Sequence, residues 1–352
     1  MNKNAFILPV SATFRDIKYP EEMIKNADAL EKQLRGKNVA IKIGKKVENE
    51  INSVQYEGVM DKKKVVVSHT ENIVPETPVE FLIMNESFDV DIKILKRLET
   101  AQYFQTPIMI HTLPKIKTYI AQDMKDQGFQ NLKIQFLKKQ VSKKSALSVG
   151  RALAHLAQLS RTWEEFKTNE SAQLSFYERS LEFLLIYPDK LDLYRKLADE
   201  FSQFSDDKEQ QEKLNRHFVW PDCHPSNMMT DKKEGIVLMN FGRSYWGDQR
   251  YMLPSFLAHV MTYSLLGYLT KTKAVEYVKD CVSGYDKLEK ITNEKIFCQY
   301  LGLEVLHCSF GRKFDSVKTT KDKITLQKFG MAIFDQEIKT IKTLLKIFSK
   351  IK

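Results

Sequence analysis

The sequence predicts a bilobal α+β fold, with a small antiparallel-sheet lobe at residues 1–124 and a larger, mainly helical lobe at residues 125–352. Three observations predict it. Short alternating or apolar segments fill the first third of the chain, amphipathic helical patterns fill most of the rest, and a polar hairpin at residues 219–242 interrupts them. With 352 residues, 43% of them hydrophobic, the chain can build one large core or two ordinary ones.

The first lobe opens with a helical pattern at residues 20–35, which Gly36 ends. The segment TPVE at residues 77–80 has the N-cap Thr, the first-turn Pro and the Glu of a capping box, so it predicts a second helix of about six turns. Five strands are expected to form one sheet: NVAIKIG (38–44), SVQYEGVM (53–60), KKVVVSH (63–69), PIMIH (107–111) and KTYIAQDM (117–124).

The second lobe is expected to be mostly helical, with long amphipathic patterns at residues 145–166 and 172–186. His155 lies in the first of these among small apolar residues, and we interpret it as a packed histidine rather than a base or ligand. Residues 337–352 place apolar side chains on one face of a helix and lysines around it. We favour a helix docked on its own domain, with a membrane-surface or partner-binding helix as the alternative.

Composition narrows the class of protein. The chain has 55 Lys and Arg against 45 Asp and Glu, a net charge of +10, but the basic residues are spread along it, so no specific nucleic-acid surface is expected. No apolar run approaches the length that spans a bilayer, so no transmembrane segment is expected. We expect a soluble intracellular protein, in the cytoplasm or, since the first 15 residues lack acidic side chains, in mitochondria.

The cysteines and histidines show no metal-binding spacing along the sequence. There is no CxxC pair, no zinc-type spacing and no HExxH motif. The sequence therefore predicts neither a disulfide framework nor a metal cluster, and it favours a reducing compartment. The four cysteines are Cys223, Cys281, Cys298 and Cys308.

The hairpin at residues 219–242 reads VWPDCHPSNMMTDKKEGIVLMNFG. Its Asp222 and Asn227 have the D-x-x-x-x-N spacing with which phosphotransferases of the protein-kinase fold place an Asp that orients and deprotonates the attacking hydroxyl and an Asn that holds Mg²⁺. The following strand ends in Asn240-Phe241-Gly242, where a second metal ligand is expected. In isolation, the motif is also explained by Asp222 capping an ordinary turn. The sheet-then-helix order around it favours the kinase-fold interpretation.

Two pairs of segments carry a resemblance to a known family. PDCHPSN and IVLMNFG resemble the catalytic and metal-binding segments of the aminoglycoside phosphotransferase and choline kinase superfamily. YWGDQRYMLPSFLAHVMTYSLLGYL and CQYLGLEVLHCSFGRKFD are more similar to 5-methylthioribose kinase than to other members. The resemblance covers nearly the whole chain and is weakest in the first lobe. It implies a protein-kinase-like fold and the use of ATP and Mg²⁺.

The resemblance also implies roles for individual residues. Asp222 is expected to be the catalytic Asp, and Asn227 and Asn240 are expected at the metal. His224 is expected to brace the loop through a hydrogen bond. The residues expected at the nucleotide are Gly44, in a phosphate loop at residues 44–52, and Gln122, Asp123 and Met124, in a hinge that receives adenine.

The chain departs from the family at several of these positions. Asn240 stands where the family has the metal-binding Asp, which removes a negative charge from the Mg²⁺ site. Trp220 replaces a His, Gly44 is the lone glycine of its loop, and Cys298 and Gln299 stand where methylthioribose kinases have paired arginines. The strand expected to carry the phosphate-binding Lys offers Ser68 and His69, and its acidic partner stays open among Glu86, Asp89 and Asp91.

Three functions remain from the sequence. We favour a degenerate kinase-fold protein, a pseudokinase, that serves as a binding or structural subunit with a protein partner or as a homodimer, and that needs no cofactor. The alternative is an active small-molecule kinase with ATP and Mg²⁺, because Asp222 and Asn227 are both kept. A nucleic-acid-binding protein is a minor alternative that rests on the net charge alone.

Overall fold

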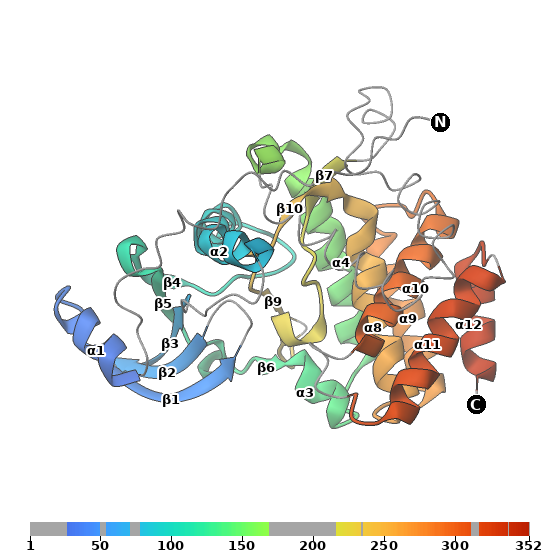
Figure 1. Ribbon diagram of the computed structural model, residues 1–352, viewed down its shortest axis with the longest axis horizontal. Helices are drawn as coiled ribbons and strands as arrows, with labels where there is room; N and C mark the ends of the chain where they lie inside the picture. The colour runs from blue at the N-terminus through green and yellow to red at the C-terminus, as the bar shows by residue number, and fades with distance from the viewer. Residues whose placement is uncertain are drawn as a thin grey trace. The chain divides into compact units, whose positions relative to one another are not determined.

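A computed structural model describes seven stretches of the chain (Figure 1): residues 27–49, 54–70, 78–168, 216–233, 235–310, 317–336 and 338–351. The chain divides into two compact units. Unit 1 comprises Met1–Asn85 with Met109–Ala121, and unit 2 comprises Glu86–Ile108 with Gln122–Lys352. The first is built on an antiparallel sheet and the second is mainly helical, which confirms the predicted α+β class.

Unit 1 contains a five-stranded sheet in the order β1-β2-β3-β5-β4. The helix α1 (Ala27–Arg35) contributes Leu30 and Leu34 to its core, where they pack with alternate residues of the strands. All five predicted strands exist, and the start of the helix predicted at residues 20–35 lies outside the described residues. The strands are β1 (Lys42–Asn49), β2 (Val54–Met60), β3 (Lys63–His69), β4 (Met109–Leu113) and β5 (Thr118–Gln122).

The first strand differs from its prediction in extent. The sequence predicts a strand at residues 38–44 and a phosphate loop from Gly44 onward, whereas β1 continues to Asn49. The reason is pairing with β2, which runs with irregular register from Lys42 opposite Val59 to Asn49 opposite Val54. The predicted loop is thus mostly strand, and residues 50–53 lie outside the described part.

The helix α2 (Pro78–Arg97) begins at the proline that the capping signal places in its first turn. Its buried face includes Phe88 and Leu95, and the chain then turns through Leu98. Because Glu86–Ile108 belongs to unit 2, the second half of this helix can position residues of the hairpin.

Unit 2 is mainly helical, and its long helices from α4 to α12 lie beside one another in Figure 1. α4 and α9 pack closely, and α10 packs on both α8 and α11. α8 is buried over nearly its whole length. The helix predicted at residues 172–186 lies outside the described residues. The main helices are α3 (Leu132–Leu137), α4 (Lys143–Leu159), α8 (Met252–Leu265), α9 (Lys271–Tyr285), α10 (Glu294–Phe310), α11 (Thr320–Asp335) and α12 (Ile341–Lys350).

The final helix is docked on its own unit, as we favoured from its pattern. α12 buries Leu344, Leu345 and Phe348, and the Phe348 ring lies 5.4 Å from that of Phe329.

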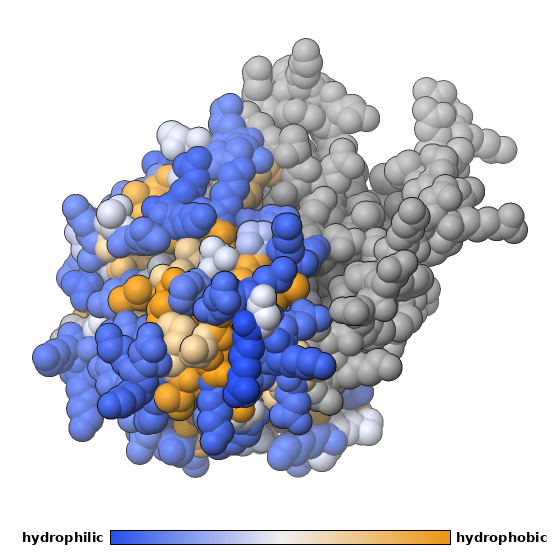
Figure 2. All heavy atoms as spheres, turned by 90° about the vertical axis from the view of Figure 1, so that its left-hand side faces the viewer, coloured by the Kyte–Doolittle hydropathy of each residue, from blue (hydrophilic) through white to orange (hydrophobic). Residues whose placement is uncertain are grey.

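Among the helices of the described stretches, none combines the length and apolar character needed to cross a membrane. Among the residues coloured by hydropathy in Figure 2, hydrophilic ones cover most of the surface, and apolar ones gather between them.

Candidate functional site

The polar hairpin is built on short strands of unit 2. β7 (Arg216–Val219) pairs with β10 (Tyr245–Asp248), and β8 (Met228–Thr230) pairs with β9 (Ile236–Leu238). Between β7 and β8, a short 3₁₀ turn at Pro225–Asn227 reverses the chain. The Met239 N–H donates to the Asn227 carbonyl at 3.1 Å, which extends the pairing of the hairpin. This pairing places the loop that contains Asp222 at the same end of the β8–β9 hairpin as Asn240.

Asn227 connects three of the predicted site residues. Its Nδ2 donates to the Asp222 carbonyl at 2.9 Å, and its Oδ1 accepts from Asn240 Nδ2 at 2.6 Å. The Asn227 residue is only 3% exposed, whereas Asp222 and Asn240 are half-buried. The spacing of the sequence motif therefore corresponds to one cluster in the folded chain.

His224 lies within the same loop and contacts both ends of it. Its N–H donates to the Asp222 carbonyl and its carbonyl accepts from the Asn227 N–H, each at 2.9 Å. Its ring Nε2 lies 3.3 Å from Asn227 Nδ2.

Cys223, beside Asp222, is fully buried, and burial raises the pKa of its thiol, so it stays protonated and is no nucleophile.

The Asn240-Phe241-Gly242 segment is held from two sides. Asn240 adopts a left-handed backbone with φ 63°, which Asn tolerates better than most residues. Its carbonyl accepts from the Trp220 ring N–H at 3.0 Å, and the Phe241 N–H donates to Asp91 Oδ1 at 2.7 Å. Trp220 thus supports the segment. Asp91, one of three acidic candidates in α2, binds this backbone.

Gly242 meets a spatial requirement. A Cβ at this position would lie 2.7 Å from the Ser87 carbonyl oxygen of α2, which is closer than a carbon atom can approach. The glycine therefore allows the end of the hairpin to contact the helix backbone. This contact and the Asp91 hydrogen bond fix Asn240 relative to the buried half of α2.

The predicted hinge residues also lie in unit 2. The Gln122 N–H donates to the Ile108 carbonyl at 2.9 Å, and Asp123 caps a short 3₁₀ turn by accepting from the Lys125 N–H. Met124 is buried and packs with Met229 and Val237 of the hairpin strands. Hinge and hairpin therefore share one small core.

The remaining predicted nucleotide residue, Gly44, belongs to β1 of unit 1. So do Ser68 and His69, at the end of β3 where a phosphate-binding Lys is expected. His69 is buried, and its Nδ1 lies 2.9 Å from the Thr118 hydroxyl. Burial lowers the pKa of His69 to about 4, against the smaller opposing effect of the Ile116 carbonyl. The ring is therefore neutral at pH 7 and cannot supply the charge of a Lys.

His155 is a packed residue, as the sequence predicts. Its ring lies edge-on to Tyr103 at 5.0 Å and to Phe104 at 6.1 Å, and burial lowers its pKa.

Sequence reasoning missed a different cluster. His259, Glu304 and Cys308 meet between α8 and α10, and the His259 ring lies 5.3 Å from that of His224. The signal available in the sequence was the Glu-x-x-x-Cys spacing on one helix.

Comparisons with solved structures find the fold of small-molecule kinases. An ethanolamine kinase from Plasmodium vivax matches with a TM-score of 0.53 and 11% identity, over 89% of this chain and 91% of that one. A microcompartment-associated aminopropanol kinase matches with a TM-score of 0.53 and 11% identity, over 89% and 98%. A choline kinase from Cryptosporidium parvum matches with a TM-score of 0.54 and 10% identity, over 91% and 100%.

No family model matches the chain, and no curated protein matches it by sequence. The structural matches have very low identity, so they show the fold alone. The chain has a kinase-like fold, as its motifs predict.

Proposed function

We propose that the chain is a kinase-fold protein of the aminoglycoside phosphotransferase and choline kinase superfamily that serves as a binding or structural subunit, with little or no phosphotransfer. The motif segments favour 5-methylthioribose kinases as the related members. The observation that carries the proposal is the 2.6 Å hydrogen bond from Asn240 Nδ2 to Asn227 Oδ1.

This hydrogen bond occupies the place where a kinase needs a cation. Two oxygen ligands of one Mg²⁺ lie roughly 3 Å apart, because each is about 2.1 Å from the ion in octahedral geometry. Here an amide N–H, which a cation repels, points at Asn227 Oδ1 instead. The amide therefore joins two side chains that a cation would otherwise join. The residues present therefore fit Mg²⁺ poorly.

A second observation concerns the phosphate groups of a nucleotide. The neutral, buried His69 stands where a charged Lys is expected, so that position cannot neutralise phosphate oxygens. Catalysis of phosphoryl transfer works by positioning and charge neutralisation, and both the metal position and the Lys position have lost charge. We therefore assign this chain a non-catalytic role, with a protein partner or a second copy of itself, in the cytoplasm or mitochondria.

The second candidate function is an active ATP-dependent kinase that acts on a small-molecule hydroxyl. The observation in its favour is that Asp222, Asn227 and His224 form one ordered loop, although a non-catalytic protein has no chemical need of all three. Ethanolamine, aminopropanol and choline, named for the similar structures, and methylthioribose are the substrates to try.

The test is ATP turnover with Mg²⁺ on that panel, followed as ADP release. We expect no turnover in the wild type, in Asp222→Ala or in Asn38→Asp. Asn38→Asp is the matched control because Asn38 is an exposed Asn that also has a left-handed backbone, with φ 60°. Wild-type turnover that Asp222→Ala abolishes and Asn38→Asp leaves intact would establish the active kinase and overturn our proposal.

A further inference from the structure

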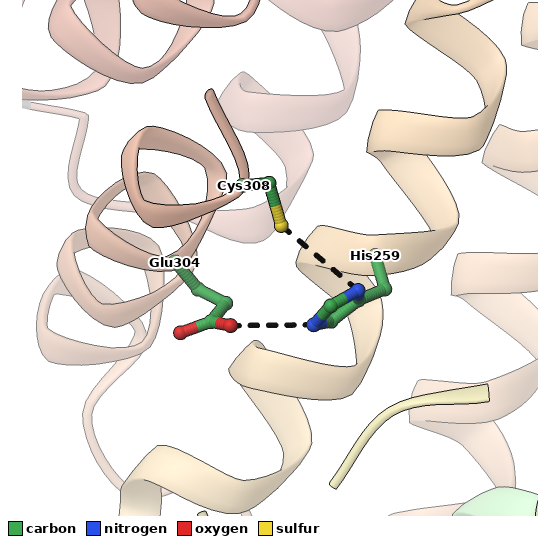
Figure 3. Close-up of side chains that lie close together, drawn as sticks. All are labelled: His259, Glu304 and Cys308. Carbon is green, nitrogen blue, oxygen red and sulfur yellow. Dashed lines mark hydrogen bonds and ion pairs between the residues drawn. The ribbon is translucent and has the colours of Figure 1, made fainter. Parts of the chain in front are cut away.

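The cluster that sequence reasoning missed lies at the interface of α8 and α10. Glu304 and Cys308 are one turn apart on α10, so their side chains share a face, and His259 of α8 points at both (Figure 3). All three residues are buried, with 9% exposure or less. The packing of the two helices, rather than any sequence motif, brings them together.

The three side chains are close enough to share an ion. His259 Nε2 lies 3.2 Å from Glu304 Oε1, and His259 Nδ1 lies 3.9 Å from Cys308 Sγ, and an ion would bind only one of these two ring nitrogens. One ligand atom from each residue lies within 4.8 Å of the others. Ligands of a tetrahedral zinc ion are separated by about 3.3–3.6 Å, as follows from metal–ligand bonds of about 2.0–2.3 Å. Closing the set onto one ion therefore needs side-chain shifts of about 1 Å.

We propose that His259, Glu304 and Cys308 bind a divalent metal ion of the zinc class. An imidazole nitrogen, a carboxylate oxygen and a thiolate form a mixed donor set that suits Zn²⁺ and its probe Co²⁺, and does not suit Mg²⁺ or Ca²⁺. Three protein ligands leave a fourth position for water. The inference is independent of phosphotransfer and holds whether or not the protein is a kinase.

The surroundings of Glu304 support a ligand role. Its Oε2 accepts from the Tyr251 hydroxyl and lies 3.3 Å from His307 Nδ1, whereas Oε1 faces His259. One carboxylate oxygen is therefore held by outer partners and the other points into the cluster. Metal-binding carboxylates are commonly oriented in this way by a second set of hydrogen bonds.

A metal-free arrangement explains the same contacts and is the outcome that competes with the proposal. In it, His259 bridges Cys308 and Glu304 through its two ring nitrogens. Burial favours the neutral ring, but Cys308 and Glu304 outweigh it and raise the pKa of His259 to about 10. A chain of hydrogen bonds of this kind needs no ion, so metal content decides between the two.

The experiment measures zinc in the purified full-length chain and titrates the metal-stripped protein with Co²⁺. We expect about one metal ion per chain and a thiolate-to-cobalt charge-transfer absorption band. Cys308→Ser and Glu304→Gln should each weaken binding at least tenfold, and Tyr251→Phe about tenfold through the orientation of Glu304. Cys298→Ser is the matched control, because Cys298 is a buried thiol of the same helix outside the cluster.

The results separate the alternatives even where a variant folds poorly, because Glu304→Gln is nearly isosteric and the charge-transfer band is read in the wild type. A band that Cys298→Ser keeps and Cys308→Ser or Glu304→Gln loses supports the site. Wild-type protein without zinc and without a cobalt–thiolate band overturns it. So does a band that persists unchanged in Cys308→Ser.

Discussion

The burial of His69 decides whether its ring is charged at neutral pH. It lies at the end of β3, buried against the Thr118 hydroxyl, and its pKa is about 4. An exposed histidine at the same sequence position would be partly charged near pH 6.5 and could attract phosphate. The sequence places a histidine there, but only its burial shows that the charge is missing.

The low pKa of His69 predicts a pH dependence of stability. The unfolded chain binds a proton at His69 near pH 6.5 and the folded chain only near pH 4, so acid favours unfolding. The contribution is complete above pH 6.5 and is lost as the pH falls from 6.5 to 4. The melting temperature of the wild type should therefore fall relative to that of His69→Gln as the pH falls over this range. Curves that stay parallel would contradict the buried, neutral ring.

The Asn240 side chain leads to a second prediction, on how the stability of the variant Asn240→Asp depends on Mg²⁺. In Asn240→Asp a carboxylate oxygen replaces the N–H that donates to Asn227 Oδ1, so two oxygens face each other. Without metal, the variant should lose about 1–3 kcal/mol of unfolding free energy. Mg²⁺ should restore part of it, because a cation can join the two oxygens. Thermal melts with Mg²⁺ and with EDTA measure this, and Asn38→Asp should show no Mg²⁺ effect.

At the scale of elements, α4 and α9 cross with their backbones in contact. A Cβ at Gly284 of α9 would lie 2.2 Å from the Leu147 carbonyl, and one at Gly150 of α4 would lie 2.0 Å from the Cys281 carbonyl. Each helix therefore needs a glycine where the other passes. The two carbonyl contacts are reciprocal, which fixes the register of the pair.

Gly284→Ala tests this crossing. The overpacking should cost about 3 kcal/mol, against about 1 kcal/mol gained in helix propensity, for a net loss of roughly 2 kcal/mol. A lower melting temperature of Gly284→Ala, with little change in its exposed neighbour Ser283→Ala, is the expected result. Equal melting temperatures for the two variants would mean that the helices do not cross at this glycine.

The elements are also what the sequence predicts best. β2 is predicted by its alternating burial pattern, β3 by its run of valines and α2 by its first-turn proline, because these signals are local. The predicted extent of β1 was wrong, because pairing with β2 determines where this strand ends. Local patterns contain no information on how far a partner strand continues.

At the scale of the whole molecule, the predicted loop residues meet because their spacing matches a known motif, whereas other contacts depend on packing. The Phe241 N–H donates to Asp91, which lies 150 residues earlier in the sequence. His259 contacts Glu304 only because α8 packs against α10. Neither contact has a local signature. The same is true of the amide pair, since the sequence gives both asparagines but not the hydrogen bond between them.

We propose that the Asn240–Asn227 hydrogen bond takes the place of the metal in this protein. The direct measurement is calorimetric titration with ATP and Mg²⁺, repeated with EDTA, on the wild type and Asn240→Asp. We predict no Mg²⁺-dependent binding of the wild type tighter than about 1 μM, or about −8 kcal/mol, and stronger Mg²⁺ dependence in Asn240→Asp. Sub-micromolar, Mg²⁺-dependent binding of ATP by the wild type would show that a metal binds despite this hydrogen bond.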